Sequence, residues 1–196
     1  MAVERDYDKF AETGTYDETF DEWGYVGPDT AAVIVRNYVP LASRVLDAAC
    51  GSGLTGIALR RLGYTGITGI DISSSLFALA EQTGAYERVE RVDMQVFPLP
   101  FADDEFDAVN FIGALTYFET GEILRELCRI VRSGGHVVFS QRDDIMRERD
   151  YDAVLDGLER DGVWRRVFGT EPMPYLPHRP DYGDHIKVQY FVYEVV

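Results

Sequence analysis

The stretch VLDAACGSGLTG, residues 45–56, constrains the fold more than any other part of this chain. A short apolar run ends in a loop with the G-x-G-x-x-G spacing, at Gly51, Gly53 and Gly56. Glycines at this spacing let the backbone turn from a buried strand into a helix and approach a ligand closely. Asp71 follows twenty residues after Gly51, where an acid is expected to meet a ribose. The stretch therefore predicts a strand, a ligand-binding loop and a helix.

Strand and helix signals alternate from Ser43 to Ser140, which is typical of a parallel sheet with helices on both faces. Apolar runs bounded by glycine or proline predict strands, and helical spacing that ends at glycine predicts helices. We expect strands at residues 44–50, 66–73, 89–94, 106–115 and 136–142, and helices at 55–63, 74–84 and 120–135. Ligands bind such sheets at the carboxyl ends of the strands.

The two ends of the chain do not follow this alternation of strand and helix signals. Residues 163–177 and 185–196 are rich in β-branched and aromatic residues, which predicts a final antiparallel hairpin preceded by a helix at 150–162. The aromatic-rich N-terminus predicts short helices that cap the sheet. We therefore expect one domain over residues 1–196. Its expected parts are an N-terminal cap (1–40), a ligand-binding core (41–142) and a C-terminal helix with a hairpin (143–196).

Composition excludes several classes of partner. The formal net charge of −15 at pH 7 argues against nucleic acid and anionic membranes, because both require a basic face. The sequence has no apolar run long enough for a membrane helix and no signal-peptide pattern, so we expect a soluble, cytoplasmic monomer or homodimer. Cys50 and Cys128 are the only cysteines, and they predict reduced thiols rather than a metal site.

The acids at the strand ends decide between a pyrophosphate and another ligand. Asp47 lies four residues before Gly51, where a carboxylate would repel a pyrophosphate but suit a positively charged ligand. Asp71 can accept two ribose hydroxyls, and Asp93 at the end of the third predicted strand can accept an adenine amino group. With no basic residue in the loop, this pattern favours S-adenosylmethionine over NAD.

Four consecutive motifs carry a resemblance to a known family. VLDAACGSG, GIDIS, PLPFADDEFDAV and IVRSGGHVVF, between Ser43 and Arg142, resemble the motifs of class I S-adenosylmethionine-dependent methyltransferases. The N-terminal segment is similar to methyltransferase-like proteins of the Williams–Beuren-region type, through Tyr7, Asp8, Ala11, Tyr16, Asp17, Tyr25 and Pro28. Compared with that group, this chain carries two extra residues between Ala11 and Tyr16.

The resemblance implies a Rossmann-like α/β fold with a doubly wound, seven-stranded sheet, mostly parallel with an antiparallel last strand. Ala49 replaces the first glycine of the family's loop, so this position must keep a negative φ or tolerate a methyl group. A longer spacer after Asp93 leaves open whether the adenine contact moves to Met94 or Gln95. The resemblance implies these cofactor-binding residues: Tyr16, Tyr25, Asp47, Ala49, Gly51, Gly53, Asp71, Ile72, Asp93, Met94 and Ile112.

The residues that carry out the chemistry are less constrained by the sequence. Methyl transfer needs a general base only when the acceptor holds a proton at neutral pH. The weak candidates for catalysis or substrate contact are His178, His185 and Tyr16, while His136 is interpreted as structural. Asp143 and Asp144 follow the fifth predicted strand without a complete set of carboxylates, so no metal is expected. Phe20, Trp23 and Tyr117 either wall a substrate pocket or tie the cap to the sheet.

The sequence is consistent with three functional hypotheses. The favoured hypothesis is methyl transfer to a small-molecule acceptor. The second is methylation of a protein or peptide, which the acidic surface could recruit. The third is a catalytically silent protein that binds the cofactor and acts by interaction. The intact Asp47, Gly51 and Asp71 disfavour this third hypothesis.

Overall fold

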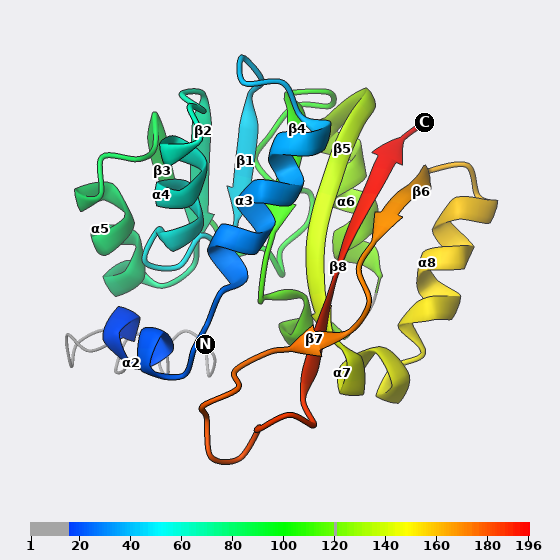
Figure 1. The fold of residues 1–196 in the computed structure, drawn as a ribbon. Helices are drawn as coiled ribbons and strands as arrows, with labels where there is room; N and C mark the ends of the chain where they lie inside the picture. Colours follow the sequence, from blue (N-terminus) through cyan, green and yellow to red (C-terminus); the bar gives the residue numbers. More distant parts are fainter. Residues whose placement is uncertain (1–15, 120) are drawn as a thin grey trace.

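A mixed sheet forms the centre of the protein, in a computed structural model that describes residues 16–119 and 121–196 (Figure 1). The order of its strands is β3-β2-β1-β4-β5-β8-β6, and a short β7 pairs with β8. The strands are β1 (Val45–Ala48), β2 (Ile67–Asp71), β3 (Arg88–Arg91), β4 (Phe106–Phe111), β5 (Val131–Arg142), β6 (Trp164–Gly169), β7 (Met173–Pro174) and β8 (Lys187–Val195).

The first five strands run parallel, as the alternating pattern predicts. β1 lies at the middle of this part, and its Asp47 stands opposite Gly69 of β2 and Asn110 of β4. Every residue of β1 and β2 is buried, which explains why both strands read as short apolar runs. Because the strands are parallel, their carboxyl ends meet at one edge of the sheet.

The C-terminal hairpin completes the sheet. β8 inserts between β5 and β6 and is antiparallel to both. The expected Rossmann-like sheet with an antiparallel last strand is therefore confirmed, and β7 adds one short strand to it. One of several boundary errors concerns the helix expected to run to Gly135, which ends at Ile130 so that β5 begins at Val131. Val131 pairs with Phe106, so ladder pairing starts before the two glycines.

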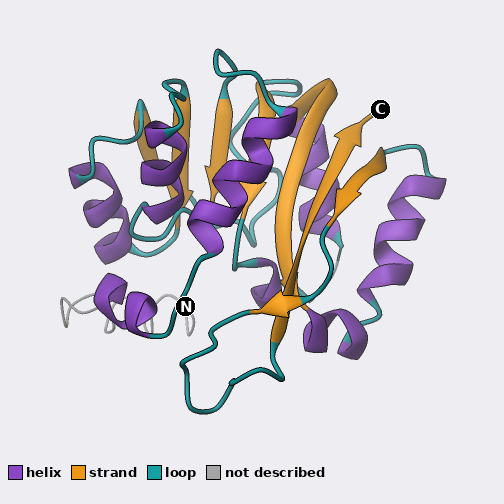
Figure 2. Ribbon diagram, in the orientation of Figure 1, coloured by secondary structure: helices purple, strands orange, loops and turns teal. Residues whose placement is uncertain are grey.

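Helices cover both faces of the sheet (Figure 2). α3 (Gly27–Tyr38) and α4 (Leu54–Arg61) pack on one face, and α6 (Glu122–Ile130), α7 (Asp143–Glu148) and α8 (Tyr151–Arg160) pack on the other. α5 (Ser74–Gln82) contacts β2 and β3. Each face buries its own apolar cluster, which is the layered arrangement that α/β proteins use.

The described part of the expected N-terminal cap does not form a single unit over the sheet edge. α3 belongs to the sheet layers, because Ala31, Ile34 and Val35 are buried against the sheet and α4. Within residues 16–40, α2 (Tyr16–Glu22) is the helix that lies at the carboxyl edge of the strands, next to the long loop between β7 and β8 (Figure 1). Tyr7, Asp8 and Ala11 lie outside the described residues. Within residues 16–119 and 121–196, no helix has the length and apolar character needed to cross a membrane.

A substitution of Trp164, at the start of β6, tests the packing of the hairpin. The Trp164 ring stacks on Tyr193 at a centroid distance of 4.1 Å, and its indole N–H donates to the Leu155 carbonyl at 3.3 Å. Replacing Trp164 with alanine is expected to lower the free energy of unfolding by about 3–5 kcal/mol, because it leaves a large cavity. The neighbouring, exposed Arg165→Ala is expected to cost less than about 1 kcal/mol. Urea unfolding followed by circular dichroism measures both, and similar losses in the two variants would contradict this packing.

Candidate active site

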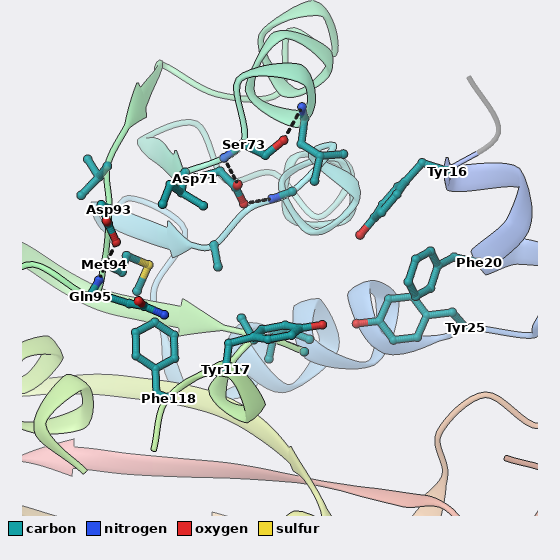
Figure 3. A pocket seen from close by; sticks show the side chains of 18 of the residues that line it. Tyr16, Phe20, Tyr25, Asp71, Ser73, Asp93, Met94, Gln95, Tyr117 and Phe118 are labelled. Atoms are coloured by element: carbon teal, nitrogen blue, oxygen red, sulfur yellow. Dashed lines mark hydrogen bonds between the residues drawn. The ribbon is translucent and has the colours of Figure 1, made fainter. Parts of the chain in front are cut away.

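A cavity of about 350 Å³ opens at the carboxyl edge of the parallel strands (Figure 3). Its size is within the range of small-molecule and cofactor sites. It is lined by the ends of β1, β2 and β4, the segment after β3, α2, and the loop before β8. The lining residues are Tyr16, Phe20, Tyr25, Ala49, Gly51, Asp71, Ile72, Ser73, Leu76, Val92, Asp93, Met94, Gln95, Ile112, Gly113, Ala114, Tyr117, Phe118 and Tyr175.

The loop from β1 to α4 forms the floor of the cavity. Gly51 has a φ of 57°, and a side chain built there would meet nothing nearer than the Tyr16 hydroxyl, at 3.9 Å. The space above Gly51 is therefore open to a ligand. Ala49 has a φ of 56°, so the second of the two expected alternatives applies. The fold tolerates the methyl group of Ala49 in the left-handed region, where it packs against the core beneath the sheet edge.

Asp71 ends β2 and fastens two segments of the cavity wall to each other. Its Oδ2 accepts a hydrogen bond from the Gly51 N–H, and its Oδ1 accepts one from the Ser73 N–H, both at 2.9 Å. The Ser73 hydroxyl in turn accepts from the Leu76 N–H at 3.2 Å and caps α5. The two backbone hydrogen bonds thus fix the carboxylate at the cavity wall.

The segment after β3 forms the opposite end of the cavity. Asp93, Met94 and Gln95 all lie in the lining. The Gln95 N–H donates to Asp93 Oδ1 at 2.9 Å, which fixes the turn. Asp93 lies two residues beyond the end of β3 at Arg91 rather than within the strand. The three residues that the sequence left as alternatives for an adenine contact are therefore all available there.

Asp47 does not line the cavity. It is 2% exposed, and it accepts hydrogen bonds from the Tyr86 hydroxyl at 2.7 Å and from Asn110 Nδ2 at 3.0 Å. Burial raises the pKa of this carboxyl from 3.8 to about 6, against the lowering effect of both hydrogen bonds. In this structure Asp47 supports the glycine loop from below, and its contact with the charge of a ligand stays a prediction. Gly53 also stays out of the lining, because it packs against Ala80 and Thr83.

Tyr86 is a site residue that the sequence analysis missed. Its hydroxyl donates to Asp47 and accepts from the Gly56 N–H at 3.2 Å, so it joins β1 to the start of α4. A side chain at Gly56 would overlap the Tyr86 ring. The third glycine of the loop motif therefore makes room for this tyrosine. No local pattern distinguishes Tyr86 from a surface tyrosine, because its role depends on contacts far along the chain.

Aromatic side chains form the wall opposite the glycine loop. Phe20 contacts Tyr16 and Tyr25 at centroid distances of 4.9 and 5.3 Å, and Tyr25 meets Tyr175 edge-on at 5.7 Å. Figure 3 shows the Tyr16, Tyr25 and Tyr117 hydroxyls directed toward the same space. The expected Phe20 and Tyr117 line the cavity, but Trp23 does not. Burial raises the pKa of Tyr16 well above its ordinary value, so Tyr16 keeps its proton at neutral pH and is not a base.

Trp23 instead connects α2 to the loop that precedes β8. The Arg179 guanidinium lies over the Trp23 ring at 4.8 Å and over the Tyr182 ring at 4.1 Å. On its other side, α2 is joined to the glycine loop, because the Ser52 hydroxyl donates to Asp17. These contacts hold the aromatic wall over the carboxyl edge.

The structure places neither candidate histidine at the cavity. His178 and His185 are exposed and absent from the lining, and the His178 backbone N–H donates to the Trp23 carbonyl. Their role as bases or substrate contacts stays a prediction that the lining does not support. His136 is half-buried in β5 beside Tyr38, and desolvation lowers its pKa, in line with a structural role.

Metal ligands and reactive thiols are not found where the structure describes the chain. No group of acidic, histidine and cysteine side chains suited to a metal ion occurs in the described ranges. Asp143 and Asp144 begin α7, where they form ion pairs with Arg147 and Arg142 rather than extending into solvent from a loop. Cys50 and Cys128 are buried, unbridged thiols, and burial raises the pKa of both.

Comparison with known proteins agrees with this architecture. Residues 46–139 match the family model described as methyltransferase domain. Methyltransferase-like protein 27 from Homo sapiens is 30% identical over 168 residues, which cover 81% of this chain and 66% of that protein. Demethylmenaquinone methyltransferase from Bacillus licheniformis is 38% identical over 104 residues, 51% of this chain and 45% of that protein. The chain thus spans between about half and two thirds of the length of these relatives.

Solved structures share the fold. An S-adenosylmethionine-dependent methyltransferase from Mesorhizobium loti superposes with a TM-score of 0.64 at 21% identity, covering 86% of this chain and all of that one. Residues 46–139 therefore form a domain of the class I S-adenosylmethionine-dependent methyltransferase family, as the motifs predicted. Within that class, the resemblance to methyltransferase-like proteins is confirmed by the human relative.

The buried Asp47 predicts a specific dependence of stability on pH. Its pKa is raised from 3.8 to about 6 in the folded protein, so its stabilising contribution is complete below pH 3.8 and is lost as the pH rises through 6. Asp47→Asn cannot titrate. Relative to this variant, the natural protein is expected to lose about 2–3 kcal/mol of unfolding free energy between pH 4 and pH 7.

Urea denaturation of both proteins at several pH values measures this difference. The comparison cancels the opposite slope from Asp107, Glu126, Asp143 and Asp144, whose pKa values are lowered in the folded state. A constant difference across this range would show that Asp47 has an ordinary pKa.

Proposed function

We propose that this protein transfers a methyl group from S-adenosylmethionine to a small-molecule acceptor. The observation that carries the proposal is the carboxylate of Asp71, which is held by the Gly51 and Ser73 amides at the edge of a cavity with an open loop floor. A rigid carboxylate beside a glycine loop suits a ribose with two vicinal hydroxyls. The family of residues 46–139 supports the same ligand.

The lining residues fit the cofactor along its length. Asp71 would accept the ribose hydroxyls, and Ile72 would pack beside the sugar. Asp93, Met94 and Gln95 would hold the adenine, with Ile112 closing the opposite side. The backbone at Ala49 and Gly51 would face the amino-acid part, and Tyr16 and Tyr25 would close over the sulfur. All of these residues line the same cavity.

Positioning and exclusion of water are the contributions of this chain to catalysis. When bound, S-adenosylmethionine supplies a methyl group on a positively charged sulfur, a carbon already activated for displacement. The aromatic wall from α2, η1 (Leu115–Tyr117) and the loop before β8 would keep water out and fix the acceptor in line with that carbon. Tyr16 and Tyr175, whose pKa values are raised by burial, would act as neutral hydrogen-bonding groups rather than bases.

The shape of the site supports a small acceptor. Tyr25, Tyr175 and Phe118 enclose the space beside the glycine loop, and a compact molecule fits such a space better than a folded protein surface does. The relatives from Bacillus carry demethylmenaquinone, a small molecule, in their names. Methylation of a protein or peptide and silent binding of the cofactor are the alternative outcomes of the experiments below.

Asp71→Ala tests the proposal. We expect it to weaken binding of S-adenosylhomocysteine by about 2–3 kcal/mol, a loss of roughly 30- to 150-fold, because a charged hydrogen-bond acceptor is removed. The matched control is Asp104→Asn, which changes an exposed acid in the turn before β4, far from the cavity. Calorimetric titration with S-adenosylhomocysteine and with NADH measures the affinities.

The outcomes separate the hypotheses. Binding of S-adenosylhomocysteine that depends on Asp71 but not on Asp104, with no binding of NADH, supports the proposal. Unchanged affinity in Asp71→Ala places the ribose elsewhere, and binding of NADH alone contradicts the cofactor. Transfer of label from methyl-labelled S-adenosylmethionine to protein rather than to small molecules in an extract favours the protein alternative.

A further inference from the structure

One wall of the cavity is aromatic. Phe20 and Tyr25 come from the N-terminal segment, Tyr117 and Phe118 from the region after β4, and Tyr175 from the loop before β8. Tyr117 lines the cavity and keeps 38% of its surface exposed. In Figure 3 the rings of Tyr25 and Tyr117 lie on the same side of the cavity, opposite Asp71. A molecule in this space would therefore meet aromatic rings on several sides.

The charges in the lining have one sign. Asp71 and Asp93 supply carboxylates, and the described lining residues include no lysine, arginine or histidine. Three arginines flank the region, and each donates hydrogen bonds to protein groups. Arg149 Nη1 donates to the Thr116 and Phe118 carbonyls at 2.9 and 2.8 Å. Arg91 Nε donates to the Ile72 carbonyl at 2.9 Å, and Arg142 pairs with Asp144 and donates to the Tyr182 hydroxyl at 3.0 Å. The cavity therefore favours positive over negative charge.

Aromatic faces and carboxylates stabilise the same kind of ligand. Ring faces attract cations, and this attraction grows when water is excluded. An anion in the same cavity would lose its hydration where the charged side chains of the described lining are carboxylates, at a cost in free energy. The phenol hydroxyls can donate to an anion or accept from a cation, so the ring faces and the carboxylates decide the preference.

We propose that the accepting atom is an amine nitrogen on a small aromatic or apolar molecule. This inference rests on the proposed function and narrows it to a class of acceptor. It names Tyr117, with Tyr25 and Tyr175, as the residues that determine specificity, because their rings surround the space next to the cofactor side of the cavity.

The charge changes during transfer match this environment. The neutral amine's lone pair forms the new N–C bond while the C–S bond breaks, and the electrons of that bond stay on sulfur. The positive charge passes from sulfur to nitrogen, and a proton then leaves the nitrogen for water. The site holds one positive charge before and after the transfer, so the aromatic faces stabilise the transition state as well as the product. An aliphatic amine binds as its ammonium form at neutral pH, so one proton must first pass to water before the nitrogen lone pair can attack.

Matched pairs of probes test the inference by binding. Benzylamine and benzoate, 2-phenylethylamine and 3-phenylpropionate, and tryptamine and indole-3-propionate differ mainly in charge. Calorimetric titration of each into protein saturated with S-adenosylhomocysteine gives the affinities. We expect the amine of at least one pair to bind ten times more tightly than its carboxylate. Tyr117→Leu should reduce that preference to less than threefold, because a ring face is lost.

Controls keep the binding test specific. Tyr38→Leu removes a ring on α3 that packs against His136 and Phe168, outside the cavity, and should leave the preference unchanged. Equal or tighter binding of the carboxylates, failure of all the amines to bind, or an equal effect of both tyrosine variants overturns the inference.

Transfer gives a second and independent readout. With methyl-labelled S-adenosylmethionine, a preferred amine should yield an N-methyl product identified by mass spectrometry, whereas a methyl ester from a carboxylate overturns the inference. Failure of the natural protein to bind S-adenosylhomocysteine would instead refute the proposed function. Binding of S-adenosylhomocysteine together with a preference for carboxylates refutes only the choice of acceptor.

Discussion

The hydrogen bonds that the Asp71 carboxylate accepts from the backbone hold the site together. One oxygen fixes the Gly51 amide in the loop after β1, and the other fixes the Ser73 amide before α5. Two neighbouring strands therefore present their loops at a fixed separation, with the charge of the carboxylate at the cavity edge. Charged acceptors form stronger hydrogen bonds than neutral ones, so this single side chain both shapes the site and leaves it ready to accept a ligand.

A second acidic group supports this arrangement from below. Asp47, Tyr86 and Asn110 form a buried polar network under the glycine loop, which ties β1 to β4 and to the start of α4. Such a network specifies one arrangement of a loop, because breaking it would leave buried polar groups without partners. The two acids that end adjacent strands thus have different roles: Asp71 faces the cavity and Asp47 positions the backbone.

The sequence predicted those features that depend on short stretches of neighbouring residues. Apolar runs ended by glycine located the parallel strands, and parallel strands bring Asp71 and Asp93 to one edge whatever the details of packing. Properties that depend on distant contacts were missed. Nothing near Tyr86 in the sequence indicates that its hydroxyl reaches Asp47. His178 follows the lining residue Tyr175 closely along the chain but is itself exposed and outside the lining. The end of α6 at Ile130 was also missed, because pairing of Val131 with β4 outweighed the stop signal from the glycines that follow.

The aromatic wall of the cavity also could not be predicted from local sequence patterns, because it depends on contacts between distant parts of the chain. Its members come from three separate stretches of the chain, and only the folded arrangement distinguishes Phe20 and Tyr117 in the lining from Trp23 outside it.

The measurement that tests the account most directly is a crystal structure of the complex with S-adenosylhomocysteine. We predict that both ribose hydroxyls donate to Asp71 and that the sulfur faces the space between Tyr16, Tyr25 and Tyr117. A ligand bound away from Asp71, or a sulfur directed away from these rings, would contradict the account.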